Sequence, residues 1–255
     1  MKPLLEHKIA LITGGSSGIG AVTAKTFAAE GAKVVITARR QAALDAVAAD
    51  IRAAGGTCLT VAGDVTDPAD VKRVVAEAIS AFGRVDVLVN NAGDGDFHTT
   101  TVNCTDEFWD KMIALNQTSV FRFCREVLPH MEAQGHGAIV NLSAIAGVYG
   151  NAGVSYSSAK AAVIAITRNI AVQYAGRGIR CNAVCPGPTA VDRMVDPALD
   201  GKYDKAFMAV TERHMDMSIP FSTAQEQANV IAFLASDASN AVNGQAVVTD
   251  AGRCL

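Results

Sequence analysis

The chain has 255 residues, of which 50% are hydrophobic and 18% are charged, and its formal net charge is -3. This length suits one large domain with an extensive buried core. Because positive and negative charges nearly balance, neither a nucleic-acid partner nor an anionic membrane is expected. No apolar stretch is long enough to span a bilayer, and segment 1–10 lacks the apolar core of a signal peptide. A small-molecule partner and a cytoplasmic location are therefore expected.

The six cysteines are scattered along the sequence and form neither a disulfide framework nor a metal-ligand pattern. Cys181 and Cys185 fall in a predicted strand with no histidine nearby. We expect reduced, mostly buried thiols and no bound metal.

Short β-branched runs alternate with alanine-rich helical patterns along the chain. The runs are apolar on both faces, which is typical of strands covered by helices on both sides, and the intervening segments suit right-handed crossovers. This pattern predicts an α/β fold with a single doubly wound parallel sheet, Rossmann-like, with helices on both faces. The predicted strands are 9–13, 34–37, 58–61, 85–89, 138–142, 179–184 and 246–249.

Glycines and capping residues agree with this division. Gly31 and Gly55 stand where predicted helices end, and segments 66–68 and 105–107 read as capped helix starts. No linker or repeat divides the chain, so residues 1–255 are expected to form one domain.

Segment 188–222 is the one that breaks the alternation, because it mixes prolines, charges and methionines. We expect it to form short helices over the sheet edge and to act as a substrate lid. Its methionines suggest an adaptable pocket for a bulky apolar substrate, although core packing explains them equally well. They are Met194, Met208, Met215 and Met217.

A glycine-rich turn, TGGSSGIG at 13–20, directly follows the first predicted strand and opens a helical run. Glycines let the backbone turn tightly and approach a pyrophosphate, and free N–H groups at the helix start face the anion. The spacing departs from G-x-G-x-x-G, but the position between strand and helix favours a dinucleotide site over a simple tight turn. The expected contacts are Gly14, Ser16, Ser17, Gly18, Ile19 and Gly20.

The end of the second predicted strand bears on the choice of dinucleotide. An NAD-selective site would carry an acidic residue where Ala38 stands, whereas Arg39 can bind a 2′-phosphate. NADP(H) is therefore favoured, and NAD(H) stays open. The alternative is that Arg39 and Arg40 are both solvated residues at a strand end.

Tyr156 and Lys160 are four residues apart in a helical run, which places them on one helix face. An ammonium beside a phenol, together with the positive nicotinamide ring of an oxidised cofactor, favours the phenolate and lowers the pKa of the tyrosine, so this pair can act as acid and base. Alone, the pattern could be a surface pair. However, Ser143 and the segment 90–93 each end a predicted strand at the carboxyl edge of the sheet, where ligands bind in open α/β folds.

These motifs together resemble the short-chain dehydrogenase/reductase family. The resemblance runs from about residue 8 to residue 252 and rests on the glycine turn, Asn90–Gly93, Ser143, Tyr156-x-x-x-Lys160 and Pro186–Gly187 in the family's order. Two positions depart from the family pattern. Val191 stands where many members have threonine, and Ala251 stands where glycine is usual.

The resemblance implies a role for each catalytic candidate. Tyr156 would be the general acid or base, Ser143 would bind the substrate oxygen, and Lys160 would hold the nicotinamide ribose and lower the pKa of the tyrosine. Asn116 would position a relay water from a distorted helix, or would be a buried asparagine bonded to a backbone carbonyl. Further implied cofactor contacts are Asp64, Val65, Asn90, Ala92, Gly93, Tyr156, Lys160, Pro186, Gly187 and Thr189.

The expected function is NADP(H)-dependent hydride transfer between the nicotinamide and a carbonyl or secondary alcohol. Reduction of 3-oxoacyl thioesters, steroid or bile-acid oxidoreduction, and sugar or polyol oxidation all stay open. The alternative is a catalytically silent dinucleotide-binding sensor or scaffold. The resemblance also implies a homo-oligomer joined through the helices that begin near Asp106 and Val154, with Ala159, Ala162 and Ala165 either at the contact or against the chain's own sheet.

Overall fold

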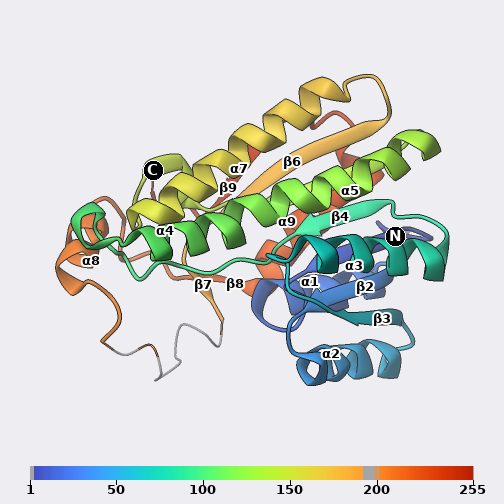
Figure 1. Ribbon diagram of the computed structural model, residues 1–255, viewed down its shortest axis with the longest axis horizontal. Helices are drawn as coiled ribbons and strands as arrows, with labels where there is room; N and C mark the ends of the chain where they lie inside the picture. Colours follow the sequence, from blue (N-terminus) through green and yellow to red (C-terminus); the bar gives the residue numbers. More distant parts are fainter. Residues whose placement is uncertain (1–2, 192–198, 200, 255) are drawn as a thin grey trace.

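The computed structural model describes residues 3–191, 199 and 201–254 and shows an α/β fold with helices on both faces of a sheet (Figure 1). In this described part, seven strands pair in the order β3-β2-β1-β4-β5-β6-β9, and every pair is parallel. The predicted fold class and strands are confirmed. The strands are β1 (Ile9–Thr13), β2 (Lys33–Ala38), β3 (Thr57–Ala62), β4 (Val87–Asn90), β5 (Gly137–Leu142), β6 (Ile179–Pro186) and β9 (Ala246–Thr249).

Alternate residues of each strand point to two separate cores, which explains why the strands are apolar on both faces. Ala10 and Ile12 pack in the core under α1, α2 and α9, whereas Leu11 packs in the core under α3, α5 and α7. Each large apolar side chain buried in this way contributes about 1.5–3 kcal/mol. The helices are α1 (Gly18–Ala29), α2 (Gln41–Ala53), α3 (Pro68–Phe82), α5 (Ser119–Gln134), α7 (Val154–Gln173) and α9 (Ala224–Ala235).

The predicted helix starts have side-chain caps. Asp67 accepts a hydrogen bond from the Ala69 backbone N–H at 2.8 Å, and Thr105 accepts one from the Phe108 N–H at 3.2 Å, which starts α4 (Asp106–Ile113). Between α4 and α5 the chain forms a π-helical turn, Ala114–Thr118. A short helix, α6 (Ile145–Tyr149), precedes α7.

The predicted lid segment, residues 188–222, has the strand β7 (Thr189–Ala190) near its start and reaches the strand β8 (Ser222–Thr223) at its end, and these two strands pair with each other. It contains α8 (Lys205–Glu212), as the prediction of short helices requires. Met194 lies outside the described residues. In the described part of the chain, no helix has the length and apolar character needed to cross a bilayer.

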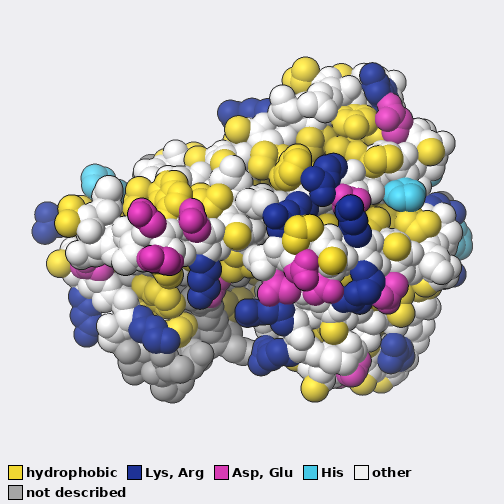
Figure 2. All heavy atoms as spheres, in the orientation of Figure 1, with side chains coloured by type: hydrophobic (Ala, Val, Ile, Leu, Met, Phe, Trp, Pro, Cys, Tyr) yellow, Lys and Arg dark blue, Asp and Glu magenta, His cyan; other side chains and the backbone are white. Residues whose placement is uncertain are grey.

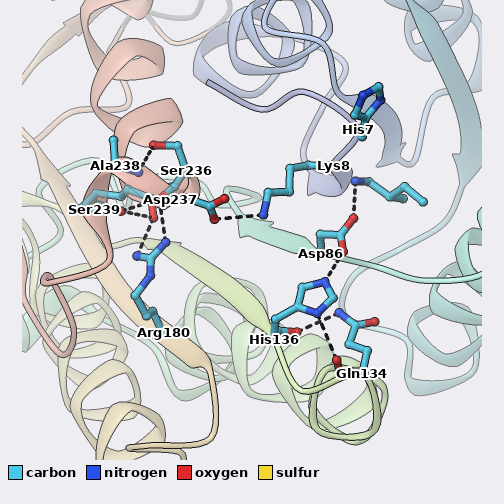
Figure 3. A network of polar contacts seen from close by, with 12 residues as sticks. His7, Lys8, Asp86, Gln134, His136, Arg180, Ser236, Asp237, Ala238 and Ser239 are labelled. Atoms are coloured by element: carbon cyan, nitrogen blue, oxygen red, sulfur yellow. Dashed lines mark hydrogen bonds and ion pairs between the residues drawn. The ribbon is translucent and has the colours of Figure 1, made fainter. Parts of the chain in front are cut away.

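Paired charges tie together the amino-terminal edge of the strands (Figure 3). The buried Asp86 carboxylate accepts hydrogen bonds from the Ile9 N–H at 2.7 Å and from Arg84, and it pairs with His136 at 2.7 Å. Nearby, Lys8 pairs with Asp237 at 3.0 Å. The opposite, carboxyl edge of the strands lines a larger crevice.

The cysteines are free thiols, as expected. Cys58, Cys124, Cys181 and Cys185 are buried, and Cys104 and Cys254 are partly buried.

Candidate active site

The carboxyl ends of the strands line one crevice of about 1120 Å³ beside the point where the strand order reverses between β1 and β4. Ligands of open α/β sheets bind at such switch points. Of the predicted site residues, the following line this crevice: Gly14, Ser16, Ser17, Gly18, Ile19, Arg39, Asp64, Val65, Ala92, Gly93, Ser143, Tyr156, Lys160, Pro186, Gly187 and Thr189.

The glycine turn leaves no room for a side chain at Gly14 or Gly20. Gly14 has a φ of +66°, and a Cβ there would lie 2.8 Å from the Asn91 amide nitrogen. A Cβ at Gly20 would collide with the Gly14 carbonyl oxygen, so Gly20 packs the start of α1 against the turn rather than lining the crevice. Ser17, the N-cap of α1, makes no side-chain cap in the described structure. The cradle therefore fits a pyrophosphate held by backbone N–H groups.

Asn91, rather than Asn90, braces this turn. The Asn91 side chain donates hydrogen bonds to the Thr13 and Gly14 carbonyl oxygens at 2.9 and 3.2 Å. Asn90 was predicted as a cofactor contact, but its side chain is buried within the sheet and donates to Asn141 Oδ1 at 2.8 Å. Side chains alternate along a strand, so consecutive asparagines at the end of β4 point in different directions.

Arg39 and Arg40 follow β2, are exposed and line the adenosine end predicted for the crevice. Within the described residues, neither guanidinium forms an ion pair with a carboxylate. Asp64, at the end of β3, also lines the crevice, and its carboxylate accepts a hydrogen bond from the Thr66 N–H at 2.8 Å.

Ser143, Tyr156 and Lys160 come together at the other end of the crevice. Ser143 follows β5 and its hydroxyl donates to the Lys160 carbonyl oxygen at 2.7 Å. Lys160 is 3% exposed, donates from Nζ to the Leu142 carbonyl oxygen at 2.7 Å, and lies with Nζ 5.5 Å from the centre of the Tyr156 ring. The three side chains are thus gathered around one opening, as predicted.

The electrostatics of this group differ from the expectation for the tyrosine. Burial raises the pKa of Tyr156, and the negative charge of Asp96 raises it further. Burial also lowers the pKa of Lys160 from 10.5 to about 8. The predicted lowering of the tyrosine pKa by Lys160 is therefore not seen in the protein alone, because desolvation of the phenol outweighs an ammonium that is turned toward a carbonyl.

Asn116 is fully buried in the π-helical turn, which agrees with the helix distortion that the family resemblance implies. Its amide donates to the Asp94 and Met112 carbonyl oxygens, each at 3.1 Å, and its Oδ1 accepts from the Asp94 N–H at 3.1 Å. A Cβ at Gly93 would lie 2.7 Å from Asn116 Oδ1. Asn116 therefore holds the loop after β4 in place through hydrogen bonds to the Asp94 backbone. It does not itself line the crevice in the described structure.

The segment after β6 forms one wall of the crevice. Thr189 donates its hydroxyl to the Gly187 carbonyl oxygen at 3.0 Å, and Val191 lines the crevice beside it. The other departure from the family pattern, Ala251, has a left-handed φ of 57°. The turn therefore keeps the conformation that glycine favours.

The described methionines of the lid do not line the crevice. Met217 contacts Arg253 instead, with a Nη2 to Sδ distance of 3.0 Å. An aromatic cluster, defined here as Phe97, His98, Tyr203 and Phe207, joins the lid to the loop after β4. Sequence reasoning did not find this cluster, because its members come from two segments far apart in the chain.

Comparisons with known proteins agree with this geometry. Residues 8–200 match the short chain dehydrogenase family. The chain is 39% identical to a 3-oxoacyl-(acyl-carrier-protein) reductase of Thermotoga maritima over 97% of this chain and 98% of that protein. It is 40% identical to a cis-4-hydroxycyclohexanecarboxylate dehydrogenase of Sinomonas cyclohexanicum over 99% and 98%.

Among solved structures, levodione reductase superposes with a TM-score of 0.89 at 34% identity, over 97% of this chain and 98% of that one. The family uses a nicotinamide dinucleotide, which the glycine cradle fits. The chain belongs to the short-chain dehydrogenase/reductase family and is an oxidoreductase that acts on carbonyl or alcohol groups.

Proposed function

We propose that the protein is an NADP(H)-dependent carbonyl reductase or secondary-alcohol dehydrogenase in which Tyr156, Ser143 and Lys160 carry the chemistry and Asn116 supports them. One observation carries the proposal: a single crevice reaches from the glycine cradle and Arg39 to the Ser143, Tyr156 and Lys160 group. All four residues are present, which argues against a catalytically silent sensor.

The roles follow from the positions of the side chains. In reduction the Tyr156 hydroxyl donates its proton to the substrate oxygen, and in oxidation the phenolate takes a proton from the alcohol. The Ser143 hydroxyl can turn from the Lys160 carbonyl to the substrate oxygen, where it stabilises developing negative charge. The bound dinucleotide supplies or accepts the hydride. Lys160 lies beside the phenol and can hold the ribose of the cofactor.

The first experiment is a spectrophotometric screen of ketones and alcohols with both dinucleotides. The probes include an acetoacetyl thioester, a substituted cyclohexanone, a steroid ketone and a polyol, which represent the open substrate classes and the activities of the similar proteins named above. Tyr156→Phe is expected to lose at least about a hundredfold in kcat. A variant as fast as the parent protein on its best substrate would contradict the proposal.

The preference for NADP(H) rests on Arg39, which follows β2 and lines the crevice, and on the lack of an acidic side chain at Ala38. Arg39→Asp is expected to weaken NADP(H) binding by at least about tenfold and to leave NAD(H) binding much less changed, because the 2′-phosphate loses its cation. Arg40→Asp is the matched control. Equal losses for both dinucleotides would count against a phosphate-binding role for Arg39.

The proposal also includes residues 188–222 as a substrate lid and a homo-oligomer. The lid is supported by its position, since Thr189 at its start lines the crevice and β7 and β8 join its two ends. The homo-oligomer is supported by hydrophobic side chains that are grouped over α5 and α7 on the face shown in Figure 2. A cytoplasmic location stays a prediction from the sequence.

A further inference from the structure

Asp96 is a buried carboxylate that caps the helix carrying Tyr156. It is 2% exposed and comes from the loop after β4. Its oxygens accept hydrogen bonds from the backbone N–H groups of Gly153 at 3.1 Å and Tyr156 at 2.9 Å, and from the Ser155 hydroxyl at 3.0 Å. A carboxylate at this position satisfies N–H groups that the first turn of a helix leaves unpaired and interacts favourably with the helix dipole.

The fit between this carboxylate and α7 is close. Gly153, the N-cap of α7, has no room for a side chain, because a Cβ there would collide with the Asp96 carboxylate. A backbone contact runs in the same direction, since the Val154 N–H donates to the Thr99 carbonyl oxygen at 3.2 Å. The loop after β4 therefore fixes the first turn of α7 through both a side chain and the backbone.

The same loop also holds the lid. The Phe97 carbonyl oxygen accepts a hydrogen bond from the N–H of Asp204, the N-cap of α8, at 3.0 Å. The Phe97 ring meets Tyr203 edge to face with 5.5 Å between ring centres, and His98 lies 6.0 Å from Phe207. The loop that contains Asp96, Phe97 and His98 thus joins the start of the catalytic helix to the start of the lid helix.

We infer that Asp96 is a positioning residue, which fixes Tyr156 relative to the lid and places a negative charge at the start of the helix that carries it. The inference rests on the proposed role of Tyr156 as the acid and base. It adds a consequence for pH: reduction, which needs the phenol, extends to higher pH, and oxidation, which needs the phenolate, begins at higher pH.

The charge contribution can be separated from the others around Tyr156. Burial and then Asp96 raise the pKa of the phenol. The Lys160 ammonium, one turn further along α7, lies near the Tyr156 ring. Cys185 of β6 interacts electrostatically with Lys160. Among the described residues, further charged or titratable groups that line this end of the crevice or pack beside the loop are Asp94, His98, Lys111, Lys202, Tyr203, Asp204 and Glu212. Substitution of Asp96 alone leaves all of these in place.

The test is the titration of Tyr156 in Asp96→Asn, which keeps an oxygen acceptor but loses the charge. The tyrosinate absorbance is recorded for each protein and for the same protein with Tyr156→Phe, so that the difference reports Tyr156 alone. We expect the Tyr156 signal of Asp96→Asn to move to lower pH by roughly one unit. The pH at which alcohol oxidation begins is expected to fall with it.

Asp86→Asn is the matched control, because Asp86 is also a buried aspartate that accepts a backbone N–H, but at the opposite edge of the sheet. It is expected to lose stability without moving the Tyr156 titration. Asp96→Glu, which keeps the charge on a longer side chain, is expected to lower kcat while the titration stays near that of the parent protein.

An unmoved Tyr156 titration in Asp96→Asn, or an equal shift in Asp86→Asn, would overturn the inference. If Asp96→Asn does not fold, Asp96→Ser, another neutral capping residue, replaces it in the same comparison. The result is distinct from the test of the proposed function, because a fully active Tyr156→Phe would remove the acid and base role whatever the titration of Tyr156 shows.

Discussion

Lys160 combines a positive charge with nearly complete burial, and this makes its contribution to stability depend on pH. Burial lowers its pKa in the folded protein from 10.5 to about 8. Between these two values the unfolded chain binds more protons at this position than the folded chain does, so the free energy of unfolding contributed by this group rises with pH. Below about pH 8 both states carry the charge, and the cost of burying it is fully present.

We therefore expect Lys160→Met to be more stable than the parent protein below about pH 8, by up to about 3 kcal/mol, with the difference shrinking toward pH 10.5. Urea unfolding of both proteins without dinucleotide, at a series of pH values, measures this difference. The same comparison at Lys25, which is exposed on α1, reports the effect of removing a surface charge. A constant difference across the whole range would contradict the assignment of a buried cation.

The backbone conformation of Ala251 leads to a prediction about stability. Its φ of 57° is left-handed, which costs a non-glycine residue about 1–2 kcal/mol. Ala251→Gly removes this strain. The greater conformational freedom of glycine in the unfolded chain offsets about 0.4–1 kcal/mol of the resulting stabilisation. A net stabilisation of about 0.5–1 kcal/mol is expected in denaturant unfolding. Ala46→Gly, at an exposed position inside α2, should instead destabilise the protein.

The residues that carry chemistry were largely predictable from the sequence, and those that position them were not. Tyr156, Lys160 and Ser143 stand in local motifs, so their convergence follows once the strand ends are known. Asn90 and Asn91 are adjacent, and only the direction of each side chain separates the buried one from the brace. Asp96 forms hydrogen bonds with residues 57 to 60 positions away in the sequence, and no local sequence pattern predicts such a contact.

At the level of elements, the turn between β1 and the start of α1 has no room for a side chain at Gly20. A Cβ at Gly20 would collide with the Gly14 carbonyl oxygen and approach the Asn91 amide, so Gly20→Ala must displace the turn or its brace. We expect dinucleotide affinity, measured by calorimetry, to fall at least about tenfold.

Gly83→Ala provides the matched control for this substitution. Gly83 has a φ of +83° and no atom within 4 Å of a new Cβ, so its substitution adds backbone strain far from the crevice. It should lower stability and leave dinucleotide affinity unchanged. If Gly20→Ala binds as well as Gly83→Ala does, the turn is not the phosphate cradle.

The strands could be predicted because burial on both faces gives them continuous apolar runs between turn residues. The helix starts at Asp67 and Thr105 could be predicted because their caps are local. The π-helical turn could not be derived from composition, since Ala114–Thr118 is an ordinary helical sequence. Its deviation depends on the Asn116 side chain, which bonds to the loop around Asp94.

Over the whole molecule, the amino-terminal and carboxyl edges of the sheet differ in function. At the amino-terminal edge, charged side chains such as Asp86 and His136 satisfy one another and hold the strands together (Figure 3). At the carboxyl edge, backbone cradles and exposed arginines are directed into a crevice. Substitutions at the first edge should therefore affect stability, and those at the second should affect binding and turnover.

We predict that two copies of the chain associate through the outer face of α5 and α7. Phe121 on α5 is 47% exposed and Val172 on α7 is 76% exposed, and both helices lie on the same layer of the fold. By contrast, Ala159 is fully buried against the chain's own core, so it does not take part in a contact between chains. Two copies that pair through α5 and α7 would cover the exposed side chains.

We expect light scattering to give a mass of at least two chains for the parent protein and a shift toward one chain for the double variant Phe121→Asp and Val172→Asp. A charged residue within an apolar contact between chains leaves a buried charge without a partner. Phe233→Asp, an equally exposed phenylalanine on α9 in the opposite layer, is the control and should keep at least two chains together. A parent protein of one chain, or a double variant with unchanged mass, would show that this face does not join the subunits.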